Sequence, residues 1–195
     1  MSTKKIGIIG NGNVGSALER GVKRAKREVR AVGNDKAQVR ATAEWADTLI
    51  LAVPFGALED VAANIAPVVE GKTVIDVTNA LTEDMSLALG YTTSGAEELQ
   101  KKLPAARVVK AFNTQFAQHM DSGRIGEQRL TMFAAGDDQP AKREVLEIAS
   151  AIGFDAVDAG PLKNARLLEP MGYMNIQLGY VLGLGTKVGL RLVRG

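Results

Sequence analysis

Short apolar runs of β type alternate with helical patterns along most of this chain, beginning at residues 6–9. The pattern predicts strands over 6–9, 29–32, 48–53, 73–77, 107–111, 130–135 and 154–157, and helices over 14–27, 58–69, 95–103 and 140–151. Parallel strands need a crossover connection, and a helix is the usual crossover. The alternation therefore predicts an α/β fold of Rossmann type, with a doubly wound, mostly parallel sheet.

One connection in this pattern is unusually short. Only residues 35–47 join the second and third predicted strands, which is near the minimum length for a crossover. We therefore expect the usual helix there to be reduced to a turn or a short extended piece around residues 38–41.

A GxGxxG string at residues 10–15 follows the first predicted strand directly and opens the first predicted helix. In that position Gly10 allows the tight turn, Gly12 lets the backbone approach a pyrophosphate, and Gly15 lets the helix pack close to the sheet. The start of the helix offers free N–H groups and a partial positive charge to the phosphates. The string predicts a dinucleotide site, and the alternative is a plain strand–turn–helix.

The residues after the second strand give two conflicting signals for the ribose of that dinucleotide. Asp35 can accept hydrogen bonds from a ribose diol, which favours NAD. Asn34, Lys36 and Arg40 can hold a 2′-phosphate, which favours NADP. The alternative for Asp35 is a turn or helix-cap residue.

Three further segments begin where predicted strands end, at the carboxyl edge of the sheet. Ligands bind at this edge in open α/β folds. Residues 52–55 follow the third strand, and their expected role is backbone and apolar contact with the cofactor. Polar residues follow the fourth and fifth strands and are expected on the nicotinamide side of the same crevice. The candidates are Ala52, Val53, Pro54, Phe55, Asn79, Asn113 and Thr114. The alternatives are a simple strand stop at Pro54 and local turn hydrogen bonds elsewhere.

The last part of the chain has a different pattern. Residues 162–193 contain no β-type run and read as one long or broken helix. Glycine inside a helix costs roughly 1 kcal/mol relative to alanine, so a run of glycines indicates close approach of a partner chain or of a flat ligand. These glycines are Gly179, Gly183, Gly185 and Gly189. We predict a dinucleotide-binding domain over residues 1–160 and a C-terminal helical segment over 161–195, for dimer contact and the second substrate.

Composition excludes several classes of site. The chain has no cysteine, which rules out disulfides, thiolate metal sites and a cysteine nucleophile. His119, the single histidine, is a candidate general acid, although a lone histidine is more often structural. The net charge is +2, so neither nucleic acid nor an anionic membrane is expected as a partner. No apolar run approaches the ~20 residues of a membrane span, and the expected location is cytoplasmic.

Several motifs now stand beside the glycine string: Ala-Val-Pro at 52–54, Asp-Val-Thr-Asn at 76–79, Val-Val-Lys-Ala-Phe-Asn-Thr at 108–114, and Asp-Ala-Gly-Pro-Leu-Lys-Asn-Ala-Arg-Leu-Leu-Glu at 158–169. Together they resemble the deazaflavin (coenzyme F-420)-dependent NADP oxidoreductase family, in a compact form. The cytosolic domain of the six-transmembrane metalloreductases is similar too. The resemblance covers essentially the whole chain, and the last motif is its most specific part.

This resemblance implies NADP(H), rather than NAD(H), at the glycine turn, a homodimer, and a deazaflavin or flavin as second substrate. It places the cofactor on Asn11, Gly12, Asn13, Val14, Asn34, Asp35, Lys36, Val53, Pro54, Phe55, Ala111, Asn113 and Thr114. Two departures are visible. Asp35 stands where the family usually has arginine, and the link after the second strand is shorter than in the family's well-known enzymes.

Hydride transfer between two stacked rings needs no nucleophile, metal or acid–base pair, so we predict no catalytic side chain. We therefore predict that the protein is an NAD(P)H-dependent oxidoreductase that acts on a small-molecule redox partner. One alternative is a reductase of a small imine or ketone, with His119 or Thr114 as the proton donor. Another is a non-catalytic NAD(P)H sensor.

Overall fold

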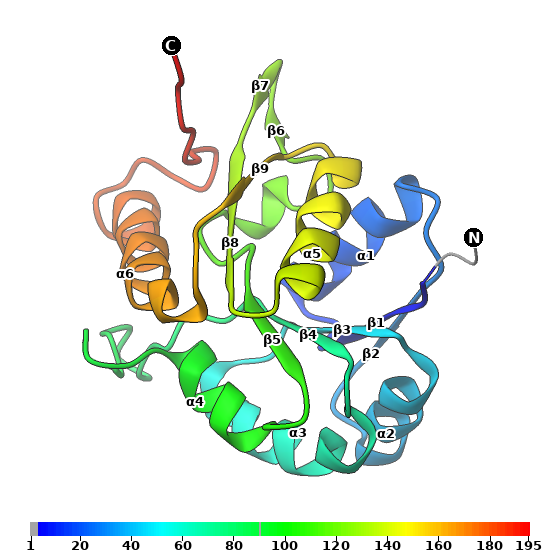
Figure 1. The fold of residues 1–195 in the computed structure, drawn as a ribbon. Helices are drawn as coiled ribbons and strands as arrows, with labels where there is room; N and C mark the ends of the chain where they lie inside the picture. Colours follow the sequence, from blue (N-terminus) through cyan, green and yellow to red (C-terminus); the bar gives the residue numbers. More distant parts are fainter. Residues whose placement is uncertain (1–3, 90) are drawn as a thin grey trace.

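Strands and helices alternate along the chain in the structure, a computed structural model that describes residues 4–89 and 91–195 (Figure 1). The strands are β1 (Ile6–Ile9), β2 (Val29–Val32), β3 (Thr48–Leu51), β4 (Thr73–Asp76), β5 (Arg107–Lys110), β6 (Arg124–Ile125), β7 (Gln128–Arg129), β8 (Thr131–Gly136) and β9 (Asp155–Asp158). The helices are α1 (Asn13–Arg24), α2 (Lys36–Trp45), α3 (Leu58–Ile65), α4 (Gly95–Lys102), α5 (Gln139–Ile152) and α6 (Ala165–Ile176). No helix within the described residues is long and apolar enough to cross a bilayer.

The main sheet has the order β2-β1-β3-β4-β5-β8-β9, and helices cover both of its faces (Figure 1). One face packs on α1 and α5 around a core that includes Leu18 and Ile148. The other packs on α2, α3 and α4 around a core that includes Leu49 and Leu99. β1 to β5 pair in parallel. The predicted Rossmann-type fold is confirmed.

One pairing of this sheet is antiparallel. β8 runs against β5, with Val109 opposite Gly136 and Lys110 opposite Ala135. In the described stretch 111–130 between these strands, the chain forms loops and the β6-β7 hairpin rather than an α-helix. Without a crossover helix the chain turns back, and β8 therefore reverses direction.

The link after β2 forms a full helix, so the expected reduction to a turn is wrong. Asp35 is the N-cap of α2, and its carboxylate accepts a hydrogen bond from the backbone N–H of Gln38 at 2.8 Å. Val39 and Ala43, one turn apart, are buried on the same face of the helix. Because the cap is the first residue of the link, nearly all of the link can be helical, which a count of its length alone does not reveal.

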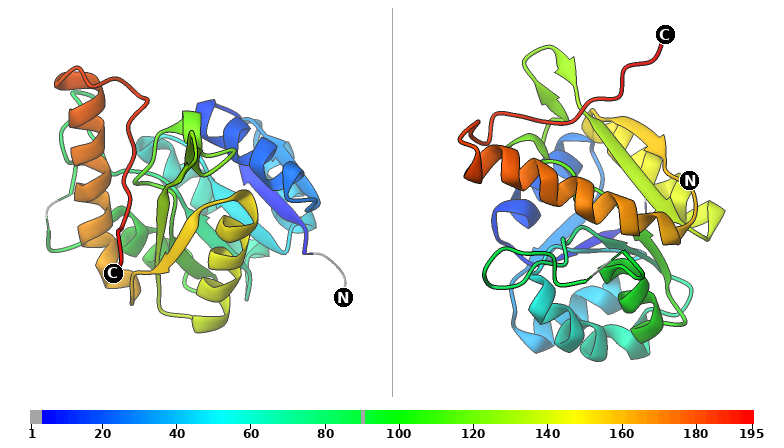
Figure 2. Two further views of the ribbon diagram at one scale, coloured as in Figure 1. Left: turned by 90° about the horizontal axis from the view of Figure 1, so that it is seen from above. Right: turned by 90° about the vertical axis from the view of Figure 1, so that its left-hand side faces the viewer.

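The C-terminal segment is helical only in its first half. A π-helical turn over Gln177–Val181 follows α6, and Gly183 and Gly185 then adopt φ of +76° and +73°, which ends the helix. Beyond them the chain runs back past the start of β8 as an extended tail (Figure 2), where the Leu190 carbonyl accepts a hydrogen bond from the backbone N–H of Thr131 at 3.0 Å. The predicted helix over 162–193 is therefore wrong from residue 182 onward.

Candidate functional site

The turn between β1 and α1 is shaped by its three glycines. Gly10 has φ of +105°, and a Cβ there would lie 2.2 Å from the carbonyl oxygen of Ala52. A Cβ on Gly15 would lie 1.8 Å from the carbonyl oxygen of Gly10. Gly12 differs, because a Cβ there would meet nothing within 4 Å. Gly10 and Gly15 are thus required by the fold, whereas Gly12 faces open space.

That open space lies at the start of α1. Gly12 is the N-cap of the helix, no side chain caps it, and the first turn carries no acidic residue. The first N–H groups of a helix have no partner within the helix and favour an anion. The predicted phosphate cradle of Gly12, Asn13 and Val14 therefore has both the space and the donors that a pyrophosphate needs.

A cavity of about 420 Å³, here cavity A, opens on the β2 side of this turn. Its lining includes four of the predicted cofactor residues. The lining residues are Ile9, Gly33, Asn34, Lys36, Val39, Val53, Pro54, Ala57, Asp60, Val61 and Asn64. Phe55 does not line it and instead lies against Gly95 at the start of α4. The Ala52 backbone packs against Gly10 beneath the turn.

The charges around cavity A are not all free to meet a ligand. Asp35 caps α2 and is absent from the lining. Arg40 donates to the carbonyl oxygen of Asn64 at 2.7 Å and to the Glu44 carboxylate at 3.1 Å. Lys36 is the one cation among the lining residues. The interpretation of Asp35 as a helix-cap residue is thus confirmed. Arg40 already has hydrogen-bond acceptors within the protein.

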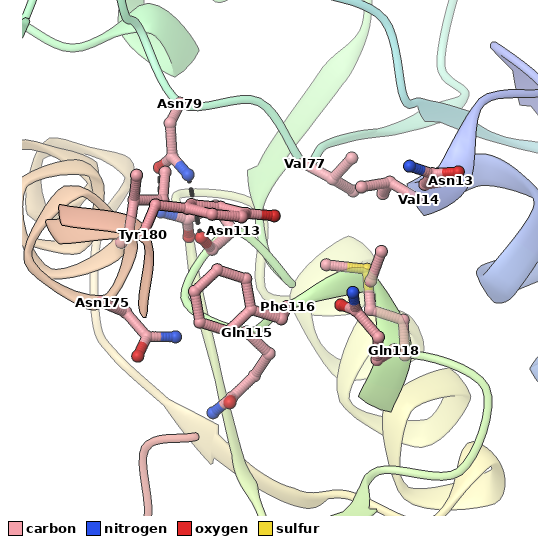
Figure 3. A pocket seen from close by; sticks show the side chains of 14 residues that line it. Asn13, Val14, Val77, Asn79, Asn113, Gln115, Phe116, Gln118, Asn175 and Tyr180 are labelled. Atoms are coloured by element: carbon pink, nitrogen blue, oxygen red, sulfur yellow. Dashed lines mark hydrogen bonds between the residues drawn. The ribbon is translucent and has the colours of Figure 1, made fainter. Parts of the chain in front are cut away.

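A second cavity, of about 230 Å³ and here called cavity B, opens on the other side of the glycine turn (Figure 3). It gathers side chains from α1, from the loops after β4 and β5, and from the C-terminal segment. The lining residues are Asn13, Val14, Val77, Asn79, Asn113, Gln115, Phe116, Ala117, Gln118, Met120, Gly172, Asn175, Ile176 and Tyr180. The sequence analysis assigned the C-terminal segment to the second substrate but did not single out Gly172, Asn175, Ile176 or Tyr180, because no local pattern connects them to the glycine turn.

Two of the predicted polar residues meet in cavity B. Asn113 Nδ2 donates to Asn79 Oδ1 at 2.9 Å and to the Leu168 carbonyl oxygen at 2.7 Å, while Asn79 Nδ2 donates to the Asn113 carbonyl oxygen at 3.0 Å. Gly172 lies directly on this pair, since a Cβ there would be 2.6 Å from Asn79 Oδ1. Close contact with α6 therefore holds both amides in place.

The residues around Asn113 are unusual in two ways. Phe112 is buried and has φ of +65°, a left-handed conformation that is strained for a bulky residue. Among the described residues, Asn113 Oδ1 and Thr114 Oγ1 are buried and have no hydrogen-bond partner. Buried polar atoms are nearly always paired, so this turn has unused bonding capacity. Ala111 and Thr114 line neither cavity.

A buried ion cluster joins three of the sequence motifs, those at residues 76–79, 108–114 and 158–169. Lys110 Nζ lies 2.9 Å from Asp76 Oδ2 and 2.9 Å from Glu169 Oε1, and all three side chains are almost fully buried. Glu169 also accepts hydrogen bonds from the backbone N–H groups of Gly95 and Ala96 at the start of α4. Burial by itself lowers the pKa of Lys110, but the two carboxylates outweigh burial and raise that pKa above its ordinary value. The cluster therefore fastens α4 and α6 to the sheet.

His119 does not reach cavity B. Its ring is buried, and Nε2 lies 2.9 Å from the Thr186 carbonyl oxygen in the tail. The interpretation of His119 as a general acid therefore has no support from the geometry, and its contact is structural.

Two of the four glycines singled out in the C-terminal segment, Gly179 and Gly189, meet parts of the same chain, whereas a Cβ on Gly183 or Gly185 would meet nothing within 4 Å. A Cβ on Gly179 would be 2.5 Å from the Phe116 ring, and one on Gly189 would be 2.8 Å from the Leu130 side chain. The predicted homodimer stays a prediction.

Comparisons with known proteins identify a family and several structures that this chain resembles. Residues 5–80, which hold the glycine turn and β1 to β4, match the family described as NADP oxidoreductase, coenzyme F420-dependent. Rat metalloreductase STEAP3 is 36% identical over 106 residues, which cover 54% of this chain and 21% of that protein. Over these segments the chain is similar to this oxidoreductase family. It spans about a fifth of the length of the curated relatives it matches.

Solved structures extend the likeness in fold beyond the matched segment. A protein from Arthrobacter sp. FB24, provisionally assigned as an F420-dependent NADP reductase, superposes with a TM-score of 0.86 at 23% identity, covering 98% of this chain and 100% of that one. Pyrroline carboxylate reductase from Plasmodium falciparum, solved with NADP bound, has a TM-score of 0.64 at 19% identity, covering 91% of this chain and 66% of that one. Both structures are under 25% identical to this chain, and they show the shared fold.

Proposed function

We propose that this chain transfers hydride between NADP(H) and a deazaflavin or flavin-type acceptor. The proposal rests on one observation. Cavity A, the glycine turn and cavity B follow one another along the carboxyl edge of the sheet. A dinucleotide has the matching sequence of nucleoside, pyrophosphate and nucleoside. The open Cβ position of Gly12 and the unpaired atoms around Asn113 indicate that the residues present suit such a cofactor.

The roles of the chain's own residues follow from this row. Gly12 and Asn13 would hold the pyrophosphate through backbone N–H groups, and Asn34 and Lys36 would meet the ribose in cavity A. Asn79 and Asn113 would hold the nicotinamide in cavity B, and that ring supplies or accepts the hydride when bound. No carboxylate, imidazole or ammonium group is among the described residues that line cavity B, as a ring-to-ring transfer allows.

One observation favours a second candidate. The hydroxyl group of Tyr180 points across cavity B (Figure 3) and is the one phenol in its lining. Reduction of a small imine or ketone needs a proton donor as well as hydride, and a tyrosine can be that donor. In this alternative Tyr180 is the proton donor, in place of the predicted His119 or Thr114.

Nucleotide choice depends on the charges at cavity A, and Asp35→Asn tests it. Asparagine caps a helix as well as aspartate does, so α2 should remain intact while a negative charge beside Lys36 is removed. We expect NADPH to bind about two- to fivefold more tightly, with no change for NADH, because only NADPH brings a 2′-phosphate. Fluorescence titration of both nucleotides measures this. Equal changes for the two nucleotides would show that Asp35 is remote from the 2′ position.

The reaction itself is tested by anaerobic mixing of the protein with NADPH and coenzyme F-420, with FMN and a small cyclic imine as comparison acceptors and NADH as comparison donor. We expect NADPH to reduce the deazaflavin or the flavin. Imine reduction alone, lost in Tyr180→Phe, would support the second candidate. Tight NADPH binding with no acceptor reduced would instead indicate a sensor.

A further inference from the structure

The tail over residues 186–194 is held in place by hydrogen bonds rather than by burial. Within this stretch, all of it described by the structure, no residue is buried, and Leu192 and Val193 are 42% and 77% exposed. A segment with few buried apolar contacts can detach locally at a low cost in free energy, without unfolding of the whole domain. The position of the tail therefore depends on the polar contacts that it makes with the rest of the protein.

Two buried side chains of the loop after β5 make such contacts. Gln115 Nε2 donates to the Leu190 carbonyl oxygen at 2.9 Å, and Gln115 Oε1 accepts from the Leu190 N–H group at 3.2 Å. His119 Nε2 lies 2.9 Å from the Thr186 carbonyl oxygen. Gln115 and His119 are only 6% and 7% exposed. Because buried polar groups need partners, both side chains favour the docked tail.

The tail is also attached to the start of β8. The Thr131 N–H group donates to the Leu190 carbonyl oxygen at 3.0 Å, and the Leu192 N–H group donates to Thr131 Oγ1 at 2.8 Å. Gln115 Nε2 donates to the Thr131 carbonyl oxygen as well, at 2.8 Å. The Gln115 amide thus joins the loop, the tail and β8 at one point. Since β8 belongs to the main sheet, the docked tail holds the loop against a rigid element.

The same loop forms one wall of cavity B. Its contributions to the lining are Asn113, Gln115, Phe116, Ala117, Gln118 and Met120. Within loop residues 111–120 only Ala117–His119 is helical, as one turn of 3₁₀ helix, so the loop has little support from its own backbone bonds. Its shape therefore depends on the segments that pack on it, and the tail is one of these.

We propose that the tail is a strap that positions this loop, and that docking of the tail and occupation of cavity B by the nicotinamide favour each other. The inference rests on the proposed function, because it takes the nicotinamide to lie in cavity B. Coupling of this kind is reciprocal: a docked tail that strengthens nucleotide binding is itself stabilised by the nucleotide, by the same factor. His119 and Gly189 are then positioning residues, since neither lines cavity B and each acts through the tail.

Limited trypsin digestion of the full chain measures how often the tail is detached, because a docked segment must open before it is cut. Lys187 and Arg191 are exposed tail residues after which trypsin can cut. Digestion is followed by mass spectrometry with saturating NADP⁺ and, as the matched ligand, with saturating 2′-phospho-ADP-ribose, which has the adenosine half and both linking phosphates but no nicotinamide. We expect NADP⁺ to slow cleavage of the tail about tenfold, and the shorter nucleotide to leave it almost unchanged. Trypsin activity on a small peptide is checked with each nucleotide.

A variant in the tail tests the coupling from the other side. A Cβ on Gly189 would lie 2.8 Å from the Leu130 side chain and 2.9 Å from Gln115 Oε1, and both neighbours are buried, so Gly189→Val should displace the tail. We expect this variant to be cut faster in the tail and to bind NADP⁺ about tenfold more weakly, with no change for 2′-phospho-ADP-ribose. Gly195→Ala is the matched control, because a Cβ there meets nothing within 4 Å.

A variant in the loop gives an independent test. His119→Phe keeps an aromatic ring in the buried position and removes the contact with the Thr186 carbonyl oxygen. We expect the same two changes as in Gly189→Val, and circular dichroism checks that the fold is kept. Weaker binding of both nucleotides to the same extent would show a general structural role and would contradict the strap.

The outcomes separate this proposal from the proposed function. If NADP⁺ binds but leaves cleavage of the tail unchanged, or if both nucleotides slow it equally, the strap is overturned and the nucleotide site stands. Protection of the tail by NADP⁺ alone, in a protein that reduces no acceptor, supports the strap and contradicts the reaction. Failure of NADP⁺ to bind overturns both proposals.

Discussion

Gly12→Val should abolish nucleotide binding while the fold remains intact. The backbone of Gly12 has φ of −68° and ψ of −168°, an extended conformation that valine adopts readily. A Cβ there meets no atom of the protein within 4 Å, so the new side chain creates no internal clash. It would instead occupy the space over the start of α1, where we place the pyrophosphate. We expect NADPH affinity to fall on the order of 100-fold or more, because the phosphates lose both room and N–H donors.

NADPH titration by fluorescence measures the affinity, and circular dichroism with thermal melting checks the fold. Gly15→Ala is the matched control, since a Cβ there would lie 1.8 Å from the Gly10 carbonyl oxygen and must displace the backbone. We therefore expect Gly15→Ala to lower Tm and Gly12→Val to leave Tm almost unchanged. Normal NADPH binding by Gly12→Val would falsify the assignment of the nucleotide site.

Lys110→Met should cause a large loss of stability. The methionine fits the volume of the lysine chain but leaves Asp76 and Glu169 buried without their shared cation. Removing one partner from a buried ion pair typically costs about 3–5 kcal/mol, because the remaining charge stays desolvated. Chemical denaturation followed by circular dichroism gives the change in the free energy of unfolding.

Lys142→Met is the control for this experiment. Lys142 is equally buried, but its partner Asp158 is 47% exposed and can be solvated by water when the lysine is lost. We expect a loss of about 1 kcal/mol or less from the ion pair there. Similar losses in the two variants would show that the Lys110 cluster adds nothing beyond the burial of its methylene groups.

The cluster also has a defined pH dependence. The pKa of Lys110 is raised in the folded state, so its contribution is complete at pH values below the ordinary lysine pKa. The contribution is lost only as the pH rises through the raised folded-state value. The stability difference between the unaltered protein and Lys110→Met should therefore be constant near neutral pH and shrink in strongly alkaline solution.

Local patterns were sufficient for most of the fold. The strands of the parallel sheet are short apolar runs, and each helix that covers them has a recurring apolar face, so both can be recognised without knowing what they contact. The helix α2 was missed because the link was judged by its length alone, and the capping bond from Gln38 N–H to Asp35 depends on a turn that forms only with the helix. The reversal of β8 was missed because strand direction depends on the path of the whole intervening loop.

The candidate site likewise has one part that local sequence patterns predict and another part that depends on the tertiary structure. The sequence by itself determined the glycine turn, since the demands on Gly10, Gly12 and Gly15 follow from a strand, a turn and a helix that are adjacent in the chain. It also placed Asn79 and Asn113 at one sheet edge, because parallel strands end together. Only the tertiary structure decided what encloses that edge. Asn113 meets Leu168, 55 residues away, and Lys110 meets Glu169, because packing of α6 brings together residues that no local spacing relates.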